Sequence, residues 1–226
     1  MKIKYLGHSC FTIETQGYTL LFDPFISGNP LSNEIDAALV QADFILVSHA
    51  HEDHTADLVS IAKRTGAVVI AIWEIHAWLQ KQGISNTHPM NIGGKRTFDF
   101  GKVTMTYAMH SSSFADGTYG GSAAGFLLAL EGKIIYYSGD TALTQEMKLL
   151  GERYTIDWAI LPIGGNFTMD AVDAAEAASF LRTKNVIGMH FNTFGYIVID
   201  EIEAKTAFDN SGASLTLMNI GEEIAI

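Results

Sequence analysis

The stretch that decides the fold is Ala42-Asp43-Phe44-Ile45-Leu46-Val47-Ser48-His49-Ala50-His51-Glu52-Asp53-His54. Residues 42–47 form a short apolar run, the pattern of a β-strand that is buried on both faces. Residues 49–54 then hold three histidines and two acidic residues, directly before a predicted helix over 56–65 that Gly66 ends. A buried strand that leads into a polar loop and a helix predicts an α/β fold with a functional site at the strand end.

The residue types of the 49–54 loop indicate metal binding. Imidazole nitrogen and carboxylate oxygen are ligands for zinc and other divalent metals. His49 and His51 are two positions apart and can lie on one side of an extended loop, whereas the adjacent Asp53 and His54 diverge. One histidine on an apolar face is ordinarily a core residue, but three so close together each need their own partners. The alternative interpretation is a solvated acidic loop.

Three further candidate ligands each follow a strand-like run: His110 after MTYAM, Asp140 after IIYYSG and His190 after NVIGM. Strand ends at one edge of a sheet converge, and α/β folds place their sites there. Taken alone, each residue is explained as a polar side chain leaving a strand for a turn. Together with the loop they provide enough ligands for two metal ions with open positions. The full set is His49, His51, Asp53, His54, His110, Asp140 and His190.

The two halves of the chain show the same order of patterns. An extended run over 2–15, with His8, Cys10 and Thr12 on one face, turns at Gln16-Gly17 and returns over 18–22. A hairpin over 125–137 follows the same course in the second half. ADFILVSH at 42–49 also matches IDWAILPI at 156–163, and AVVIAI at 67–72 matches NVIGMH at 185–190. This pattern predicts two β-rich halves packed face to face with helices outside, although chance recurrence of hairpins is the alternative.

Domain organisation follows from what is missing between these patterns. No linker rich in proline, glycine or serine and no charge run marks a boundary, so residues 1–226 are interpreted as a single domain. The segment over 111–124 has little hydrophobic periodicity and three glycines, which predicts a loop. Long loops in compact domains are usually functional or mobile.

The spacing of the seven ligands resembles the H-x-H-x-D-H…H…D…H signature of the metallo-β-lactamase superfamily. Gly7-His8-Ser9-Cys10-Phe11, Asp23-Pro24-Phe25 and Gly164-Gly165-Asn166-Phe167-Thr168-Met169 are similar to one branch of it. That branch is a bacterial and archaeal family of small metal-dependent hydrolases, related to ascorbate-6-phosphate lactonase and to the phospholipase D that acts on N-acyl phosphatidylethanolamine. The resemblance runs from His8 to His190. It implies a four-layer αββα sandwich with an internal pseudo-duplication.

The resemblance also implies the ligand sets. His49, His51 and His110 would hold one metal ion, Asp53, His54 and His190 a second, and Asp140 would bridge both. The cofactor would be two divalent ions, zinc first, with manganese or iron as alternatives. A bridging hydroxide would cleave an ester, lactone, amide or phosphodiester bond in a small or lipid-like substrate.

Catalytic and supporting roles are assigned to further residues with their alternatives. Asp53 is expected to orient the hydroxide or to move a proton. His8 is expected at the cavity as an acid/base, a substrate contact or a supporting group, against a purely structural role. Asp23 either accepts the N–H of a ligating histidine or begins a turn. Asn166 and Asn192 are candidate substrate donors, and loop capping explains them equally well.

Composition excludes several other classes. The 226 residues include 25 acidic and 14 basic side chains, for a net charge of −11, and one cysteine. A single cysteine allows no internal disulfide, which favours a reducing, cytoplasmic compartment. The negative charge argues against nucleic acid as a partner. No apolar run reaches the roughly 18 residues of a membrane span, so stable membrane insertion is not expected. The expected partner is a small-molecule substrate, and a homo-oligomer is left open.

Two other functions are set against hydrolysis. The first is a metal-binding regulatory or binding protein on the same fold, without turnover. The intact ligand set speaks against it, because purely structural metal sites are closed. The second is a di-iron oxidoreductase. That chemistry depends on an associated flavin domain, for which 226 residues leave no room, and an extra acidic ligand between His49 and His51 is lacking.

Overall fold

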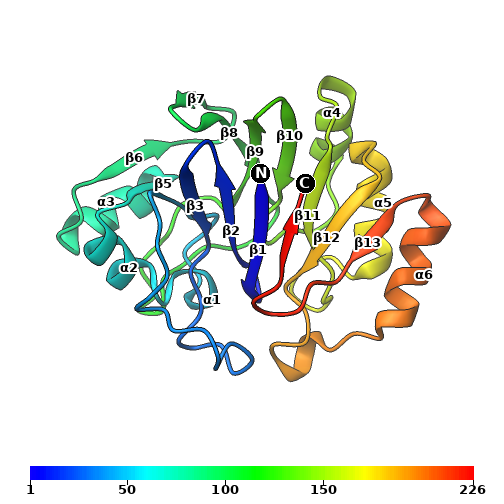
Figure 1. Ribbon diagram of the computed structural model, residues 1–226, viewed down its shortest axis with the longest axis horizontal. Helices are drawn as coiled ribbons and strands as arrows, with labels where there is room; N and C mark the ends of the chain where they lie inside the picture. Colours follow the sequence, from blue (N-terminus) through cyan, green and yellow to red (C-terminus); the bar gives the residue numbers. More distant parts are fainter.

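The computed structural model describes residues 1–226, which form two seven-stranded mixed β-sheets packed face to face (Figure 1). The first sheet, in spatial order, consists of β14 (Glu223–Ala225), β1 (Lys2–Gly7), β2 (Cys10–Thr15), β3 (Tyr18–Phe22), β4 (Phe44–Leu46), β5 (Val68–Ile72) and β6 (Thr87–Met90). The second consists of β13 (Ser214–Thr216), β12 (Asn185–Met189), β11 (Trp158–Pro162), β10 (Lys133–Tyr137), β9 (Ala124–Leu130), β8 (Gly101–Tyr107) and β7 (Lys95–Phe98).

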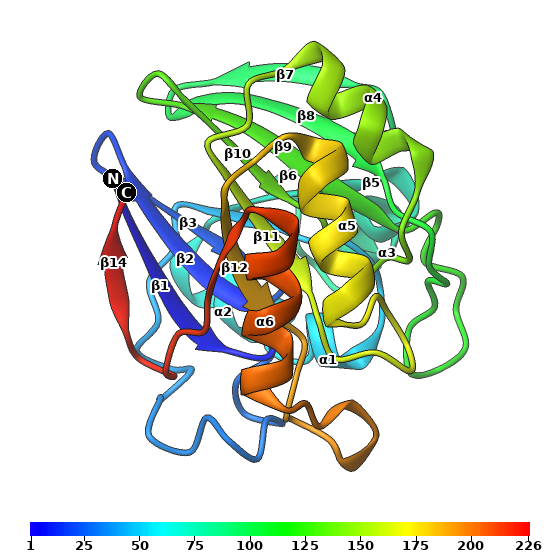
Figure 2. The same ribbon diagram turned by 90° about the vertical axis from the view of Figure 1, so that its right-hand side faces the viewer.

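Helices cover the outer faces of both sheets. The first half contributes α1 (Glu52–Thr55), α2 (Leu58–Thr65) and α3 (Trp73–Lys81). The second half contributes α4 (Gln145–Arg153), α5 (Ala171–Leu181), the 3₁₀ turn η1 (Gly195–Ile197) and α6 (Glu201–Ser211). Figure 2 shows α5 and α6 on the outer face of the second sheet. The result is the expected four-layer αββα sandwich. None of the helices combines the length and apolar character needed to cross a membrane.

The two halves repeat one topology, as the sequence pattern predicted. In the first half β1, β2 and β3 are antiparallel, and β4, β5 and β6 then add in parallel. In the second half β8, β9 and β10 are antiparallel, and β11, β12 and β13 add in parallel. The strand that continues into His49 therefore corresponds to β11, and the strand that continues into His190 corresponds to β5. The pseudo-duplication is confirmed.

Aromatic side chains hold the two sheets together. Phe22 of β3 packs against Phe126 of β9 and Tyr137 of β10, with ring centroids 6.5 and 4.9 Å apart. All three side chains are fully buried. Aromatic pairs at these separations contribute beyond the area that they bury. The packing between sheets fixes β3 against β10; Asp23 directly follows β3, and Asp140 lies in the loop after β10.

The prediction that residues 2–15 form one extended run is wrong at His8. Strand β1 ends at Gly7 and β2 begins at Cys10, so His8 and Ser9 form the turn between two paired strands. His8 has φ 55°, in the left-handed region that few residues other than glycine adopt. Its carbonyl oxygen accepts from Tyr5 Oη at 3.2 Å and from the backbone N–H of His190 at 2.9 Å. Contacts from distant segments therefore stabilise this turn.

The helix expected over 56–65 is α2, which begins at Leu58, and seven elements were not predicted. Helix α5 begins after Asp170, whose side chain accepts from the N–H groups of Val172 and Asp173. The unpredicted elements are α1, β6, α4, η1, α6, β13 and β14. Strand β14 pairs with β1 and places the two ends of the chain side by side (Figure 1).

Candidate metal centre

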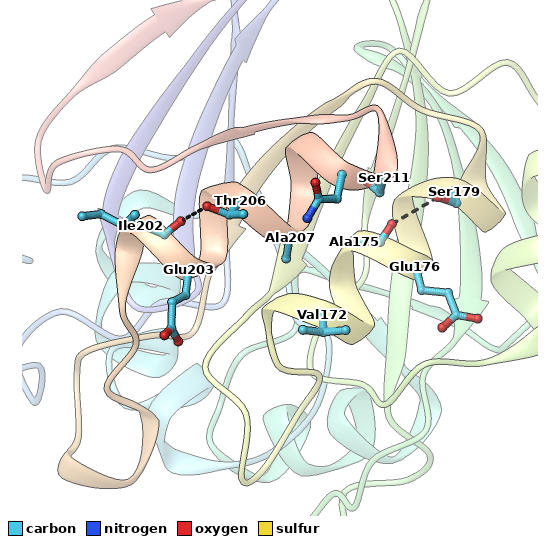
Figure 3. A pocket seen from close by; sticks show the side chains of 10 residues that line it. Val172, Ala175, Glu176, Ser179, Ile202, Glu203, Thr206, Ala207 and Ser211 are labelled. Atoms are coloured by element: carbon cyan, nitrogen blue, oxygen red, sulfur yellow. Dashed lines mark hydrogen bonds between the residues drawn. The ribbon is translucent and has the colours of Figure 1, made fainter.

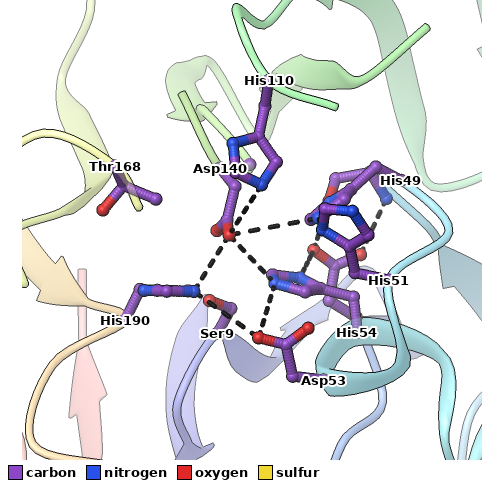
Figure 4. Close-up of polar contacts among 12 residues, drawn as sticks. Ser9, His49, His51, Asp53, His54, His110, Asp140, Thr168 and His190 are labelled. Carbon is purple, nitrogen blue, oxygen red and sulfur yellow. Dashed lines mark hydrogen bonds and ion pairs between the residues drawn. The ribbon is translucent and has the colours of Figure 1, made fainter. Parts of the chain in front are cut away.

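Four loops at one end of the sandwich carry the seven residues that the sequence singled out. The loop after β4 carries His49 and His51, the short helix α1 that follows it carries Asp53 and His54, and the loops after β8, β10 and β12 carry His110, Asp140 and His190. Figure 4 shows the histidine side chains converging on Asp140. The structure thus brings all seven together, as convergence of strand ends predicts.

Asp140 lies at the centre of the cluster. Its Oδ2 atom is 2.9 Å from Nε2 of His190 and 3.3 Å from Nε2 of His54. The same oxygen is 3.7 Å from Nε2 of His110 and 4.0 Å from Nε2 of His49. The Asp140 side chain is only 2% exposed. One buried carboxylate oxygen therefore faces histidines from both halves of the proposed ligand set.

The remaining ligand atoms fall into two groups. In the first group one ring nitrogen each of His49, His51 and His110 lies within 4.8 Å of the others. In the second group, Asp53, His54 and His190 lie within the same distance of one another, together with His8. These groups match the two sets that the resemblance implied, with His8 added to the second.

Asp23 accepts a hydrogen bond from the ring of His54, which is one of the two roles predicted for it. Its Oδ2 accepts from His54 Nδ1 at 2.8 Å and from Tyr137 Oη at 2.7 Å, and its Oδ1 accepts from the backbone N–H of Ser48 at 2.7 Å. The Ser48 hydroxyl also donates to Asp23 Oδ2, and Ser48 Oγ accepts from His49 Nδ1 at 2.9 Å. Asp23 is fully buried, so the carboxylate must be satisfied by these donors.

These hydrogen bonds assign the tautomers of the histidines. Because Asp23 and Ser48 take the Nδ1–H groups, His54 and His49 direct their Nε2 atoms into the centre. The Nε2 atom of His49 is unprotonated, whereas that of His54 faces Asp140 and carries a proton that metal binding would displace. His51 is oriented the other way, with Nε2 3.3 Å from Ser111 Oγ and Nδ1 3.0 Å from His49 Nε2. The 3.0 Å pair is a hydrogen bond in which His51 Nδ1 donates to the unprotonated Nε2 of His49, and His51 Nε2 then accepts from Ser111 Oγ.

The buried polar atoms show whether the residues fit a metal. His54 Nε2 and Asp140 Oδ1 are both buried without any hydrogen-bond partner. Buried polar atoms are almost always paired, so unpaired ones require an explanation such as an ion. The unpaired Asp140 Oδ1, the histidine nitrogens gathered around Asp140 Oδ2, and the nitrogen and oxygen donor set all fit divalent metal ions.

The electrostatics of the centre depend on Asp140 and Asp53. Burial alone would lower the pKa of His54 and His190, but the carboxylates outweigh it, holding the pKa of His54 well above its usual value and that of His190 at about 9. Burial would likewise raise the pKa of Asp140, but His190 and His54 hold it well below the usual range. By contrast, burial lowers the pKa of His49, His51 and His110. Without metal, two ring protons therefore compensate the carboxylates.

His8 lies against this second group. Its Nε2 is 3.1 Å from Asp53 Oδ2, its Nδ1 is 2.9 Å from Thr193 Oγ1, and its ring centroid is 4.1 Å from that of His190. His8 is buried behind Asp53 and does not line the cavity, so its position fits the supporting role among those expected, and its part in the reaction stays a prediction. Thr193 belongs to no motif in the sequence. Its place directly after His190 was the one available signal.

Neither of the two candidate asparagines, Asn166 and Asn192, lines the cavity at the metal centre. Asn166 is exposed at the tip of a loop with φ 54°, and the neighbouring Phe167 lines the cavity at the centre instead. Asn192 Oδ1 accepts from the backbone N–H of Ile199 at 3.0 Å, and the Asn192 N–H donates to Ile197 at 2.8 Å. Asn192 thus shapes the loop that carries Thr193. This corresponds to the loop-capping alternative rather than to substrate binding.

A cavity of about 510 Å³ opens onto the centre. Its walls include Asp53, His110 and Asp140, together with Phe114 from the long loop and Phe167. A larger hollow of about 620 Å³ lies between α5 and α6, lined by Val172 and Ile202 among others (Figure 3). That hollow contains none of the seven ligands, so volume alone does not locate the functional site.

Comparisons with known proteins point in the same direction as this geometry. Residues 18–191 match the family model described as Beta-lactamase superfamily domain. The chain is 50% identical to proteins named UPF0173 metal-dependent hydrolase from Methylacidiphilum infernorum and Flavobacterium johnsoniae, over the full length of both partners in each case. It is 38% identical to Igni18, a novel metallo hydrolase from the archaeon Ignicoccus hospitalis. That structure superposes with a TM-score of 0.89 over 99% of this chain and 97% of its own.

Proposed function

Because the chain belongs to the beta-lactamase superfamily and is a metal-dependent hydrolase, we propose that it holds two divalent metal ions, zinc first, and hydrolyses its substrate with a bridging hydroxide. His49, His51 and His110 hold one ion, Asp53, His54 and His190 hold the other, and Asp140 bridges them. The substrate is a small or lipid-like molecule with an ester, lactone, amide or phosphodiester bond.

One observation carries this proposal: Asp140 Oδ2 lies within 4.0 Å of Nε2 of His49, His54, His110 and His190. A single carboxylate oxygen between two groups of nitrogen ligands is the arrangement that a bridging ligand needs. A closed structural site would need four ligands around one ion, whereas the ligands other than Asp140 lie in two separate groups, His49, His51 and His110 in one and Asp53, His54 and His190, with His8 beside them, in the other.

The chain's own residues prepare and complete the reaction. When bound, divalent ions lower the pKa of water to about 7 and polarise a carbonyl or phosphoryl oxygen. Asp23 fixes the rings of His54 and, through Ser48, of His49, so that their ligand atoms are in place before metal binds. Asp53, with a side chain 27% exposed, faces the cavity and can take or give a proton at Oδ1 while His8 holds Oδ2.

The test compares turnover by metal-loaded protein with turnover by an Asp140 variant. Purified protein is stripped with a chelator, reloaded with zinc, manganese or iron, and assayed against generic esters, lactones, amides and phosphodiesters. We expect hydrolysis of one class, restored by metal and abolished in Asp140→Ala. Asp140→Asn keeps the side-chain shape and removes the charge, so it separates loss of the ligand from loss of the fold, which circular dichroism checks. Full activity in either folded variant would contradict the proposal.

A further inference from the structure

The cavity at the metal centre is lined by acidic side chains and by no lysine or arginine. Its charged side chains other than the histidines are all acidic: Glu52, Asp53 and Asp140. The segments that contain its lining residues, 48–57, 108–123, 138–144, 163–170 and 190–200, contain no lysine or arginine. The 14 basic residues all lie in other segments. A cleft lined by one sign of charge attracts ligands of the opposite sign and repels like charge.

Bound metal ions would not reverse this sign. Two divalent ions add four positive charges, and Asp23, Asp53, Asp140 and Glu52 together carry four negative charges. A hydroxide adds one more negative charge. The loaded centre is therefore close to neutral or slightly negative. An anionic substrate would find neither a net positive centre nor an Arg or Lys side chain of the kind that recognises phosphate and carboxylate groups.

Two phenyl rings give the cavity its apolar walls. Phe114 is buried and stacks on Trp78, with ring centroids 4.0 Å apart and planes at 14°. Its position is therefore fixed by α3. Phe167 is 51% exposed, and its ring meets that of Tyr196 edge-on at 6.1 Å. One fixed and one accessible ring provide a surface on which an apolar group can be removed from water.

Resting on the function proposed above, we propose that this centre takes uncharged carboxylic acyl substrates, namely esters, lactones or amides, with an apolar group that packs against Phe114 and Phe167. Glu52 disfavours substrates that carry an anionic group beside the scissile bond. In the reaction, the oxygen of water bonds to the acyl carbon and the carbon–oxygen or carbon–nitrogen bond breaks. One proton of the water moves to the leaving atom, and the carboxylic acid product releases the other.

Glu52 is placed to act on substrate charge without acting as a ligand. It is the first residue of α1, directly between His51 and Asp53, and its side chain is exposed at the cavity. An exposed charge pair or repulsion is worth up to about 1 kcal/mol and is weakened by salt. Glu52 is therefore expected to tune selectivity by a small factor and to leave the chemical step to other residues.

The experiment uses three probes with the same leaving group on the zinc-loaded protein. They are p-nitrophenyl butyrate, the p-nitrophenyl monoester of glutaric acid, which carries an anionic acyl chain, and bis(p-nitrophenyl) phosphate. We expect kcat/KM to be highest for the butyrate ester. In Glu52→Gln the butyrate-to-glutarate ratio of kcat/KM falls by about two- to fivefold. Glu152→Gln removes the same charge from an exposed position on α4, away from the cavity, and leaves that ratio unchanged.

A second series tests the apolar wall. With p-nitrophenyl acetate, propionate and butyrate, kcat/KM should rise with each methylene by no more than about fourfold. Phe167→Ala should flatten that rise. A higher kcat/KM for the glutarate or phosphate probe, or a charge ratio that Glu52→Gln leaves unchanged, would overturn this inference while the hydrolase assignment stands. Failure of zinc-loaded protein to hydrolyse any of the probes would count against both.

Discussion

His8 Nε2 lies 3.1 Å from Asp53 Oδ2, while His8 Nδ1 lies 2.9 Å from Thr193 Oγ1. Burial lowers the pKa of His8 to about 4, so the ring is neutral at pH 7 and carries one proton. An ionised carboxylate only accepts, so that proton is on Nε2. Nδ1 must then accept from the Thr193 hydroxyl. The Thr193 hydroxyl thereby satisfies the second nitrogen of the His8 tautomer that holds Asp53.

The first prediction concerns this hydroxyl. Thr193→Val keeps the side-chain shape but removes the donor, which leaves the buried Nδ1 of His8 unpaired and weakens its hold on Asp53. We expect kcat to fall about tenfold with a smaller change in KM, because supporting partners of metal ligands typically contribute 10- to 100-fold. Nitrogen NMR of the His8 ring shows which atom is protonated.

Thr193→Ser provides the matched control, since it retains the hydroxyl and should keep both the tautomer and most of the activity. If the valine and serine variants behaved alike in rate and in ring protonation, Thr193 would have only a packing role.

The second prediction concerns Asp23. In Asp23→Asn an amide N–H₂ replaces an oxygen that accepts from Ser48, Tyr137 or His54. One buried donor then faces another, and leaving such a group unpaired costs about 1–3 kcal/mol. We expect a lower free energy of unfolding in urea and metal affinity weakened by about 10- to 100-fold. Tyr137→Phe removes one donor but keeps the carboxylate, so its metal affinity should remain closer to wild type.

The third prediction concerns Gly120 in the long loop. A Cβ atom at this position would lie 2.2 Å from the Cβ of Ala50, which sits between His49 and His51. Gly120→Ala must therefore displace either the loop or the ligand segment. We expect weaker metal binding and lower turnover in a protein that still folds. Gly117→Ala, in the same loop but with open space around it, is the comparison for affinity. Its positive φ costs some stability without touching the ligands.

The fourth prediction concerns pH and the metal-free protein. Although burial opposes it, Asp140 raises the pKa of His190 from 6.5 to about 9. A raised pKa contributes stability that is fully present below the unfolded value and is lost as pH rises through the folded value. The free energy of unfolding, measured in urea with a chelator, should therefore fall between about pH 6.5 and 9.

His190→Asn tests the assignment of that slope. His190 has φ 56°, which asparagine tolerates better than most residues. The variant should unfold with a flatter pH dependence over the same interval. For the wild-type protein, metal binding near pH 7.5 should release protons, which calorimetry in buffers of different ionisation enthalpy counts. A stability that rose with pH across this interval would contradict the paired histidine–carboxylate arrangement.

The local sequence pattern predicted the metal-ligand candidates, because each of them follows a predicted strand. The 49–54 loop follows a buried strand, and His110, Asp140 and His190 each follow a strand of their own, so strand order alone places them at one edge. The His8 turn could not be predicted, because it depends on Tyr5 and on the backbone N–H of His190. Nothing in the local sequence shows that contact.

The same distinction applies to the fold, in which some elements have a local sequence pattern and others depend on contacts with distant strands. Hairpins and buried strands have strong local patterns, and their order predicted the layered sandwich. Strands β13 and β14 have only three residues each and exist through pairing with β12 and β1. Such short edge strands have too few side chains for a periodic pattern. Asp23 shows the same limit within the site: a turn before Pro24 and a hydrogen bond to His54 were equally compatible with the sequence.

The measurement that tests the central claim most directly is the number of metal ions per chain in the zinc-reloaded protein. Elemental analysis should give two per chain in the wild-type protein and none retained in folded Asp140→Ala after gel filtration. His110→Ala should keep one, held by Asp53, His54 and His190. A wild-type protein that bound a single ion, or an Asp140→Ala variant that kept two, would contradict a centre bridged by Asp140.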